Sequence, residues 1–561
     1  MSGVPTSTRS VARVAAEVRD VLTGGPVDPA VRCEIDWSGP VRAVLPDEAA
    51  VQAACGIMHV HGRAAGRPAA LGVDYASVVA GVLASQGELA AAIARARGAR
   101  MARVRTSVAA AALLSVQQYL AVAATDADTA EDAEPRPEPG GARPPFTTAD
   151  GVRCELETLD ADPWLRFWQA LGAEHAAIAR GWGPFQRRFG TACCALPPAL
   201  HAAVGRARFA EVLAAAAESG VAVLPVREDP VPPWEVPACT TAPLGRPGAA
   251  LRPRGGPAPL DGLVVVESTR RVQGPVTGHV LRMLGAEVIR VEPPGGDPMR
   301  GIPPTAGGTS VRYRSLNDGK RVVEVDIKSA AGRRELRELV AGAEVFVHNW
   351  APGKAAQLGL DSADLARARP GLVYAWASGW GEAAGPNPPL GTDFLVQAGG
   401  GLAAALSPAG DPVRPSLMTL TDVLGGLVCA QGVLGALLHR VRTGEGSRVD
   451  TSLFSAAGLV PRPGRRAPDP LAAPLWTEDG FAVLPPGIDP ATAAAAFGPG
   501  DLTTRFRTRP TAEWVRRGAE SGVVVTPVCA DLRELTTDDR FAAALGRADD
   551  HVFPLPPWEF S

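Results

Sequence analysis

The sequence lacks the features that mark several classes of protein. Aromatic residues make up only 5% of its 561 residues and the formal net charge is −3, so no basic surface indicates a nucleic acid or an anionic membrane as partner. No apolar run of about 18 residues predicts a transmembrane helix, and the N-terminal segment has no apolar core typical of a signal peptide. The length predicts several globular domains.

The cysteines are scattered along the chain. None of the eight forms a CxxC pair, and the adjacent Cys193 and Cys194 have no second pair or histidine cluster at metal-ligand spacing. This pattern predicts reduced thiols in a cytoplasmic protein, and no metal site. The sequence also has no Walker A motif and no GxGxxG after a predicted strand, so a simple ATP or NAD site is not indicated.

Two unequal copies of one sequence make up the chain. The alignment pairs Glu48 with Asp393, and the first copy lacks the longer segment that precedes Asp393. The matching segments keep their order: PDEAAVQAACGI (46–57) with GTDFLVQAGGGL (391–402), RVRTS (103–107) with RVDTS (448–452), and ESGVAVLPV (218–226) with ESGVVVTPV (520–528).

Pro- and Gly-rich breaks divide the chain further, because such stretches lack the periodic apolar residues of packed elements. We expect a partial large-domain repeat at 1–124, an acidic linker at 125–145, a small-domain repeat at 146–236, a second linker at 237–258, a fuller large domain at 259–460, and a shortened small domain with a C-terminal return at 471–561.

The segment before Asp393 alternates predicted strands and helices. β-branched and helical apolar patterns predict strands at 263–268, 287–292, 321–327, 344–350 and 372–378, and helices at 274–286 and 330–343. This alternation predicts an α/β fold with a doubly wound, Rossmann-like parallel sheet, accompanied by smaller α+β domains. Ligands of such sheets bind at the carboxyl ends of the strands, so we expect a nucleotide- or phosphate-bearing ligand there.

The order of several motifs resembles the class III CoA-transferases, a family that includes carnitine CoA-transferase-like proteins and α-methylacyl-CoA racemases. The resemblance implies acyl-CoA and a small carboxylic acid as substrates. The motifs lie at roughly residues 260–455. They are LDGLVVVESTRRVQGP, LGAEVIRVEPPGGDPMR, LNDGKRVVEVDIKS, VFVHNWAPGKAAQLGLD, LVYAWASGWGEAAGPNPPLGTDFLVQAGGGL and TDVLGGLVCAQGVLGALLHRVRTGEGSRVDTSLFSA.

Asp393 falls on the catalytic aspartate of that family. The resemblance implies that its carboxylate attacks an acyl-CoA thioester, and that CoA moves between acids through an aspartyl anhydride and an aspartyl-CoA thioester. Local sequence alone also allows Asp393 to N-cap a helix that begins at Phe394. Glu382 falls where some transferases use a glutamate to orient intermediates.

The resemblance further implies a set of CoA-contacting residues. They are Arg290, near the adenosine end; Asn349 and Trp350, beside the CoA; Val272 and Gln273, in the first strand–helix turn; and Lys320 and Arg321, beside the phosphates. Ala351 and Gln357 replace arginines that the family often has, which weakens the expected phosphate clamp.

Two other functions remain open. Racemisation at the α-carbon needs a flanking acid–base pair, and the racemases have a histidine before the aspartate. Here Thr392 takes that place, although Asp422 occupies the position of their second acid. The third interpretation is a non-catalytic acyl-CoA-binding or scaffold protein.

The first copy is expected to be inactive, because Glu48 replaces the aspartate and Ser77 replaces Asp422. The family forms interlocked dimers. The resemblance therefore implies either a homodimer, or a monomer in which the N-terminal copy imitates the partner subunit.

Overall fold

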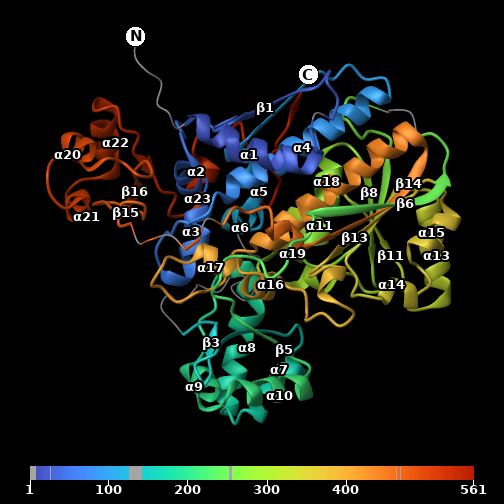
Figure 1. Ribbon diagram of the computed structural model, residues 1–561, viewed down its shortest axis with the longest axis horizontal. Coiled ribbons are helices and arrows are strands. Elements are labelled where there is room, and N and C mark those ends of the chain that lie inside the picture. The colour runs from blue at the N-terminus through green and yellow to red at the C-terminus, as the bar shows by residue number, and fades with distance from the viewer. Residues whose placement is uncertain are drawn as a thin grey trace.

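The computed structural model describes residues 8–561 apart from residues 26, 126–141, 252–255, 463, 466 and 468. Most of the expected linker at 125–145 therefore lies outside the described residues. Figure 1 shows the second copy's sheet in colours from green to orange, with the two small units at the lower edge and at one side.

A seven-stranded sheet forms the centre of the second copy. Its order is β11-β8-β7-β12-β13-β14-β6, and all neighbours are parallel except β14 and β6. The chain adds β8 and β11 on one side of β7, and then β12, β13 and β14 on its other side, as in a doubly wound fold. The predicted fold class is therefore confirmed. The strands are β6 (Cys239–Pro247), β7 (Val264–Ser268), β8 (Glu287–Glu292), β11 (Arg321–Glu324), β12 (Val345–His348), β13 (Val373–Ser378) and β14 (Glu445–Ser452).

Helices cover both faces of this sheet. On one face α11 (Gln273–Met283) and α18 (Leu420–Thr443) pack against strand side chains such as Val265 and Val347. On the other face α13 (Ala330–Ala341) and α15 (Ser362–Ala368) share a core with the alternate side chains. The central strands β7, β8, β12 and β13 are thus buried on both sides, which explains why they read as continuous apolar runs.

Strand β6 corrects the expected linker at 237–258. Its main chain pairs antiparallel with β14, from Cys239 opposite Thr451 to Pro247 opposite Glu445. The Gly- and Pro-rich sequence does not predict this strand, because it has no apolar pattern of its own. The segment is ordered by its pairing with β14, which is distant in sequence.

The first copy keeps only part of this architecture. β1 (Arg32–Asp36) and β2 (Arg103–Ser107) are parallel, and β20 (Glu559–Phe560) joins them antiparallel. By the repeat, β2 corresponds to β14 and α4 (Tyr75–Ala96) corresponds to α18. In the described part of this copy, nothing corresponds to β7, β8, β11 or β12.

Helices α4 and α18 form the centre of the contact between the copies. Both are long and apolar enough to cross a membrane by length and composition, although neither is one continuous apolar run. However, the most apolar 18-residue stretches of α4 and α18 are 100% and 89% buried inside the protein, respectively. The two helices also contact each other, since Gln86 Nε2 of α4 donates to Leu427 O of α18 at 2.7 Å. Their apolar character is accounted for by this packing.

Two small units follow the copies. The first contains β3 (Phe146–Thr147), β4 (Arg153–Glu157), α7 (Ala161–Ala170), α8 (His175–Thr191), α9 (Pro198–Arg206), α10 (Phe209–Ser219) and β5 (Ala222–Pro225). The second contains β15 (Leu475–Trp476), β16 (Phe481–Val483), α20 (Pro490–Phe497), α21 (Leu502–Arg505), α22 (Thr511–Glu520) and β17 (Thr526–Pro527).

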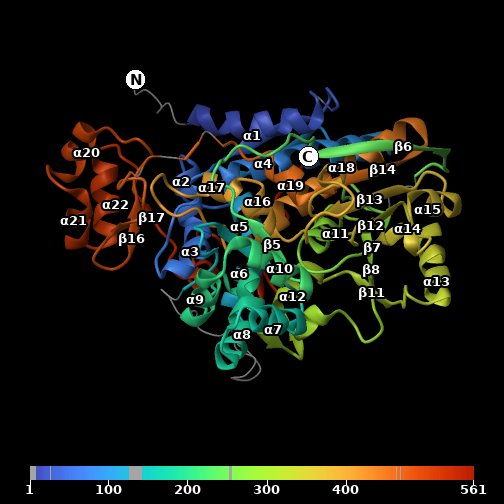
Figure 2. The ribbon, with the colours of Figure 1, turned by 60° about the horizontal axis from the view of Figure 1, so that its bottom comes forward.

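Each small unit packs on the other copy. The first covers α16 (Asp393–Gly399), where Arg227 N donates to Ala398 O at 3.0 Å. The second covers α2 (Glu48–Ala54), where Cys529 N donates to Ala53 O at 2.9 Å. These two contacts are equivalent by the repeat, and Figures 1 and 2 show the first unit near α16 and the second beside α2. The copies therefore exchange their small units within one chain.

Candidate active site

A cavity of about 550 Å³ lies at the carboxyl ends of β7, β12 and β13. Arg270 follows β7 and Asn349 follows β12, so the cavity lies at the switch point of the sheet. Asn349 joins these two strand ends, because its Nδ2 donates to Arg270 O at 2.9 Å and its Oδ1 accepts from Arg270 N at 3.0 Å. Asp393 and Asp422 also line the cavity.

Asp393 is the first residue of α16, and its carboxylate is held by the start of α18. Its Oδ2 accepts hydrogen bonds from Thr421 Oγ1 and from Asp422 N, both at 2.8 Å. Its Oδ1 accepts from Gln397 Nε2. The helix cap is Thr392, so the alternative in which Asp393 caps a helix beginning at Phe394 is wrong.

The Asp393–Asp422 pair has an unusual acid–base balance. Burial raises the pKa of Asp393 to about 6, although its hydrogen-bond donors lower it. Burial also raises the pKa of Asp422 well above its ordinary value, and the charge of Asp393 raises it further. Within the described chain, no group donates to the Asp422 carboxyl. Asp422 therefore takes the proton more readily, and Asp393 carries the negative charge near neutral pH.

The first copy's small unit supplies one wall of the cavity. Arg188 of α8 is only 2% exposed, and its Nη2 donates to Glu157 Oε2 at 3.1 Å. Its guanidinium lies 3.5 Å from the ring centroid of Phe185 and 4.8 Å from that of Phe394. A wall from the other copy thus covers the residue beside Asp393, and such closure strengthens electrostatic interactions in the site.

This wall could not be assigned from the sequence. The repeat reveals two small units, but nothing in it tells which copy each unit covers. Arg270 and Arg271, which follow β7, also line the cavity. Arg271 has a backbone φ of 66°, a conformation that non-glycine residues seldom adopt.

Three of the predicted CoA-contacting residues line the cavity: Val272, Gln273 and Asn349. Val272 precedes α11, and Gln273 is its first residue. Gln273 Nε2 donates to Ser378 O at 3.1 Å, so this side chain ties α11 to the end of β13.

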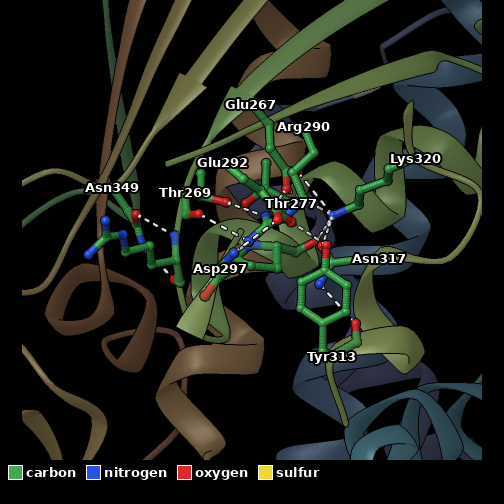
Figure 3. Close-up of polar contacts among 12 residues, drawn as sticks. Glu267, Thr269, Thr277, Arg290, Glu292, Asp297, Tyr313, Asn317, Lys320 and Asn349 are labelled. Carbon is green, nitrogen blue, oxygen red and sulfur yellow. Dashed lines mark hydrogen bonds and ion pairs between the residues drawn. The ribbon is translucent and has the colours of Figure 1, made fainter. Parts of the chain in front are cut away.

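Arg290 and Lys320 require a correction, because both lie inside the protein in a network of charges (Figure 3). Arg290 is 1% exposed and pairs with Glu267, Glu292 and Asp297. Lys320 Nζ lies 3.0 Å from Glu267 Oε2, and both side chains are fully buried. Their charges are already compensated by carboxylates. Arg290 anchors the turn that ends at Asp297, Lys320 Nζ donates to Pro275 O at 2.9 Å, and neither side chain lines the cavity.

The remaining predicted residues lie away from the cavity lining. Arg321 is exposed on the edge strand β11. The Trp350 ring packs 4.7 Å from that of His348. Glu382 is exposed and pairs with Arg448 at 2.8 Å. None of these three side chains contacts Asp393 in this structure.

Glu48 occupies a twin of the Asp393 position. Its Oε1 accepts from Gln52 Nε2 at 2.9 Å and Ala76 N at 2.8 Å, and its Oε2 accepts from Ser77 N at 2.9 Å and Ser77 Oγ at 2.7 Å. Burial raises the pKa of Glu48 to about 7. Four donors therefore occupy this carboxylate, and a serine stands where the second acid would be.

The chain is similar in sequence to known CoA-transferases. Succinyl-CoA:glutarate CoA-transferase of Mus musculus is 37% identical over 201 residues, which are 35% of this chain and 46% of that protein. Acetyl-CoA:oxalate CoA-transferase of Acetobacter aceti is 36% identical over 205 residues, which are 36% of this chain and 52% of that protein. The chain thus matches about half the length of these curated relatives.

A solved structure of a CaiB/BaiF family protein from Brucella suis is 26% identical and covers 54% of this chain and 93% of that one, with a TM-score of 0.48. The profile of CoA-transferase family III matches twice, at residues 37–230 and 260–461, which follow the two copies. The chain therefore belongs to CoA-transferase family III.

Proposed function

We propose that the protein moves CoA between an acyl-CoA and a carboxylic acid, with Asp393 as nucleophile. One observation carries this proposal: the carboxylates of Asp393 and Asp422 line the cavity at the switch point of the sheet, and that of Asp393 is buried and held by three hydrogen-bond donors. A desolvated anion whose oxygens are oriented by Thr421, Asp422 N and Gln397 is suited to attack a carbonyl carbon.

The reaction balances without water or a redox partner. Asp393 attacks the thioester carbonyl, the C–S bond breaks, and CoA thiolate departs. The product on the enzyme is an acyl-aspartyl anhydride. The thiolate then attacks the aspartyl carbonyl, which releases the first acid and leaves an aspartyl-CoA thioester. The acceptor carboxylate attacks that thioester, the C–S bond breaks with release of CoA thiolate, and a second anhydride forms. Attack of the thiolate on the acceptor's carbonyl gives the new acyl-CoA and restores Asp393.

Racemisation of an acyl-CoA is the second candidate, because Asp422 is a second titratable acid in the same cavity. Thr392 argues against it. Its hydroxyl is buried and cannot act as the histidine base of a racemase does.

A panel of acyl-CoA donors and carboxylic acids separates the candidates. Succinyl-CoA with glutarate and acetyl-CoA with oxalate are the first pairs, since relatives carry those names. We expect a new acyl-CoA, detected by mass spectrometry, and no exchange of the α-proton in D₂O. Exchange without CoA migration supports racemisation instead. A thermal shift with CoA esters but neither reaction supports the scaffold interpretation, and no shift with any ester contradicts all three.

We further propose that one chain suffices for the site, because the first small unit supplies the wall that a partner subunit supplies in an interlocked dimer. Light scattering of the active protein tests this. A monomer with full activity is expected, and activity confined to a dimer fraction contradicts it.

A further inference from the structure

A second cavity, of about 510 Å³, lies between the first small unit and the second copy. Thr147 and Arg153 line it from β3 and β4, and Arg414, Arg465 and the loop at 410–412 line it from the second copy. It shares no lining residue with the cavity of Asp393. The proposed transfer reaction leaves this second cavity without a role.

The guanidinium groups of this cavity are poorly compensated. Within the described chain, the side chains of Arg153 and Arg414 make no hydrogen bond or ion pair, whereas Arg465 Nη2 donates to Pro408 O at 2.6 Å and so braces the loop. Burial lowers the pKa of Arg153, and the charge of Arg414 lowers it further. The exposed carboxylates of Glu228 and Asp411 also line this cavity, so three guanidinium groups face two carboxylates and a net positive charge remains. Cations gathered in this way favour a bound anion.

The other half of the chain provides an internal comparison. Val226 N donates to Arg153 O at 2.8 Å, and its repeat partner Val528 N donates to Phe481 O at 3.0 Å, so Phe481 occupies the place of Arg153. Its ring lies 4.2 Å from that of Trp476, which replaces Thr147.

The same alignment places Ala69 opposite Arg414. In that half Phe481 packs with Met58 and Val528 in an apolar cluster. The crossing of the small units therefore does not require arginines. Their presence at one crossing alone, on the side of Asp393, points to a ligand.

We propose that the second cavity binds a small dianion, carboxylate or phosphate, between the guanidinium groups of Arg153 and Arg414. Such a ligand bridges the first small unit and the second copy. Strand β4 runs from Arg153 to Glu157, which lines the cavity of Asp393. Anion binding therefore stabilises the docking of the unit that forms the active-site wall.

Calorimetric titration of the full chain with inorganic phosphate and, separately, with succinate tests the proposal. We expect saturable binding of at least one anion, weaker at high ionic strength, and a raised Tm. Arg153→Gln and Arg414→Ala each lower that affinity about tenfold or more, because each removes a charge-assisted contact. Arg414→Ala copies the residue of the other half, so the fold is expected to tolerate it.

Two controls separate this site from the active site. Arg516→Gln, at an exposed helical position, leaves anion affinity unchanged. Asp393→Asn retains the phosphate binding that Arg414→Ala weakens. Acyl transfer, assayed without added phosphate, shows the opposite pattern, since it is lost in Asp393→Asn and persists in Arg414→Ala. The proposal is overturned if neither anion binds to the wild-type protein, or if both arginine variants keep its affinity. Whether phosphate or succinate binds more tightly identifies the anion class.

Discussion

Replacing Asp393 by asparagine separates chemistry from folding at this site. Asparagine has nearly the same volume but no carboxylate nucleophile, so the covalent route is lost. We expect the rate of CoA transfer to fall by at least about 10³-fold, as it does when other enzymes lose a nucleophile. The fold should survive, and the structure gives the reason.

Two opposing terms set the stability of Asp393→Asn. Burial raises the pKa of Asp393 from 3.8 to about 6, which corresponds to about 3 kcal/mol against the folded state once the group is ionised. Asparagine removes that cost. However, its amide nitrogen cannot accept a hydrogen bond, so a donor among Thr421, Asp422 N and Gln397 loses its acceptor, at about 1–3 kcal/mol. The terms nearly cancel at pH 8.

The sign of the pH dependence follows from the same pKa. Because the pKa of Asp393 is higher in the folded protein, its protonation stabilises the folded state fully below pH 3.8, the unfolded-state value. This stabilisation is lost as the pH rises through about 6. Urea unfolding between pH 4 and pH 8 should therefore show a steeper loss of stability in the wild type than in Asp393→Asn. Retention of more than about a tenth of the transfer rate, in a variant that unfolds like the wild type, refutes the assignment of Asp393 as nucleophile.

Three further predictions follow from the geometry. The rate of transfer falls as pH is lowered through about 6, because protonated Asp393 cannot attack. A pH–rate profile whose acid limb has a pKa near 3.8, the ordinary aspartate value, contradicts the effect of burial on this group. Glu48→Gln leaves the transfer rate unchanged in the same assay, and a loss comparable with that of Asp393→Asn shows that the first copy has a catalytic site. Arg290→Met lowers the free energy of unfolding by about 3–5 kcal/mol, because it leaves buried carboxylates without their cation. Arg321→Ala changes it by less than about 0.5 kcal/mol, and equal effects of the two substitutions in urea unfolding contradict the network.

Local pattern predicts the sheet well and its edges less well. The predicted strand EVIRVE has the same bounds as β8. A β-branched strand that is buried on both faces can be recognised from its own residues alone. The strand predicted at 321–327 ends at Glu324 in the structure. Strand β6 lies in the segment 237–258, where the sequence predicts a linker. Both strands lie at the sheet's edges, where pairing with one neighbour decides the outcome.

The candidate site divides in the same way. Val272 and Asn349 lie at strand ends, and the topology alone brings strand ends of a doubly wound sheet together. Arg290 does not line the cavity, because it pairs with Glu267 and Asp297 on another strand and on a turn. No local pattern reveals this pairing. Arg188 comes from the other copy, and only the three-dimensional exchange of small units places it beside Phe394.

The most direct test of the account is to trap the covalent intermediate. The protein is incubated with an acyl-CoA that it accepts, treated with hydroxylamine, and digested for peptide mass spectrometry. We predict a hydroxamate on Asp393 and none on Glu48, although both are buried carboxylates held by equivalent elements. A hydroxamate on Glu48 or on another residue, or complete turnover with no trapped adduct on Asp393, contradicts the account.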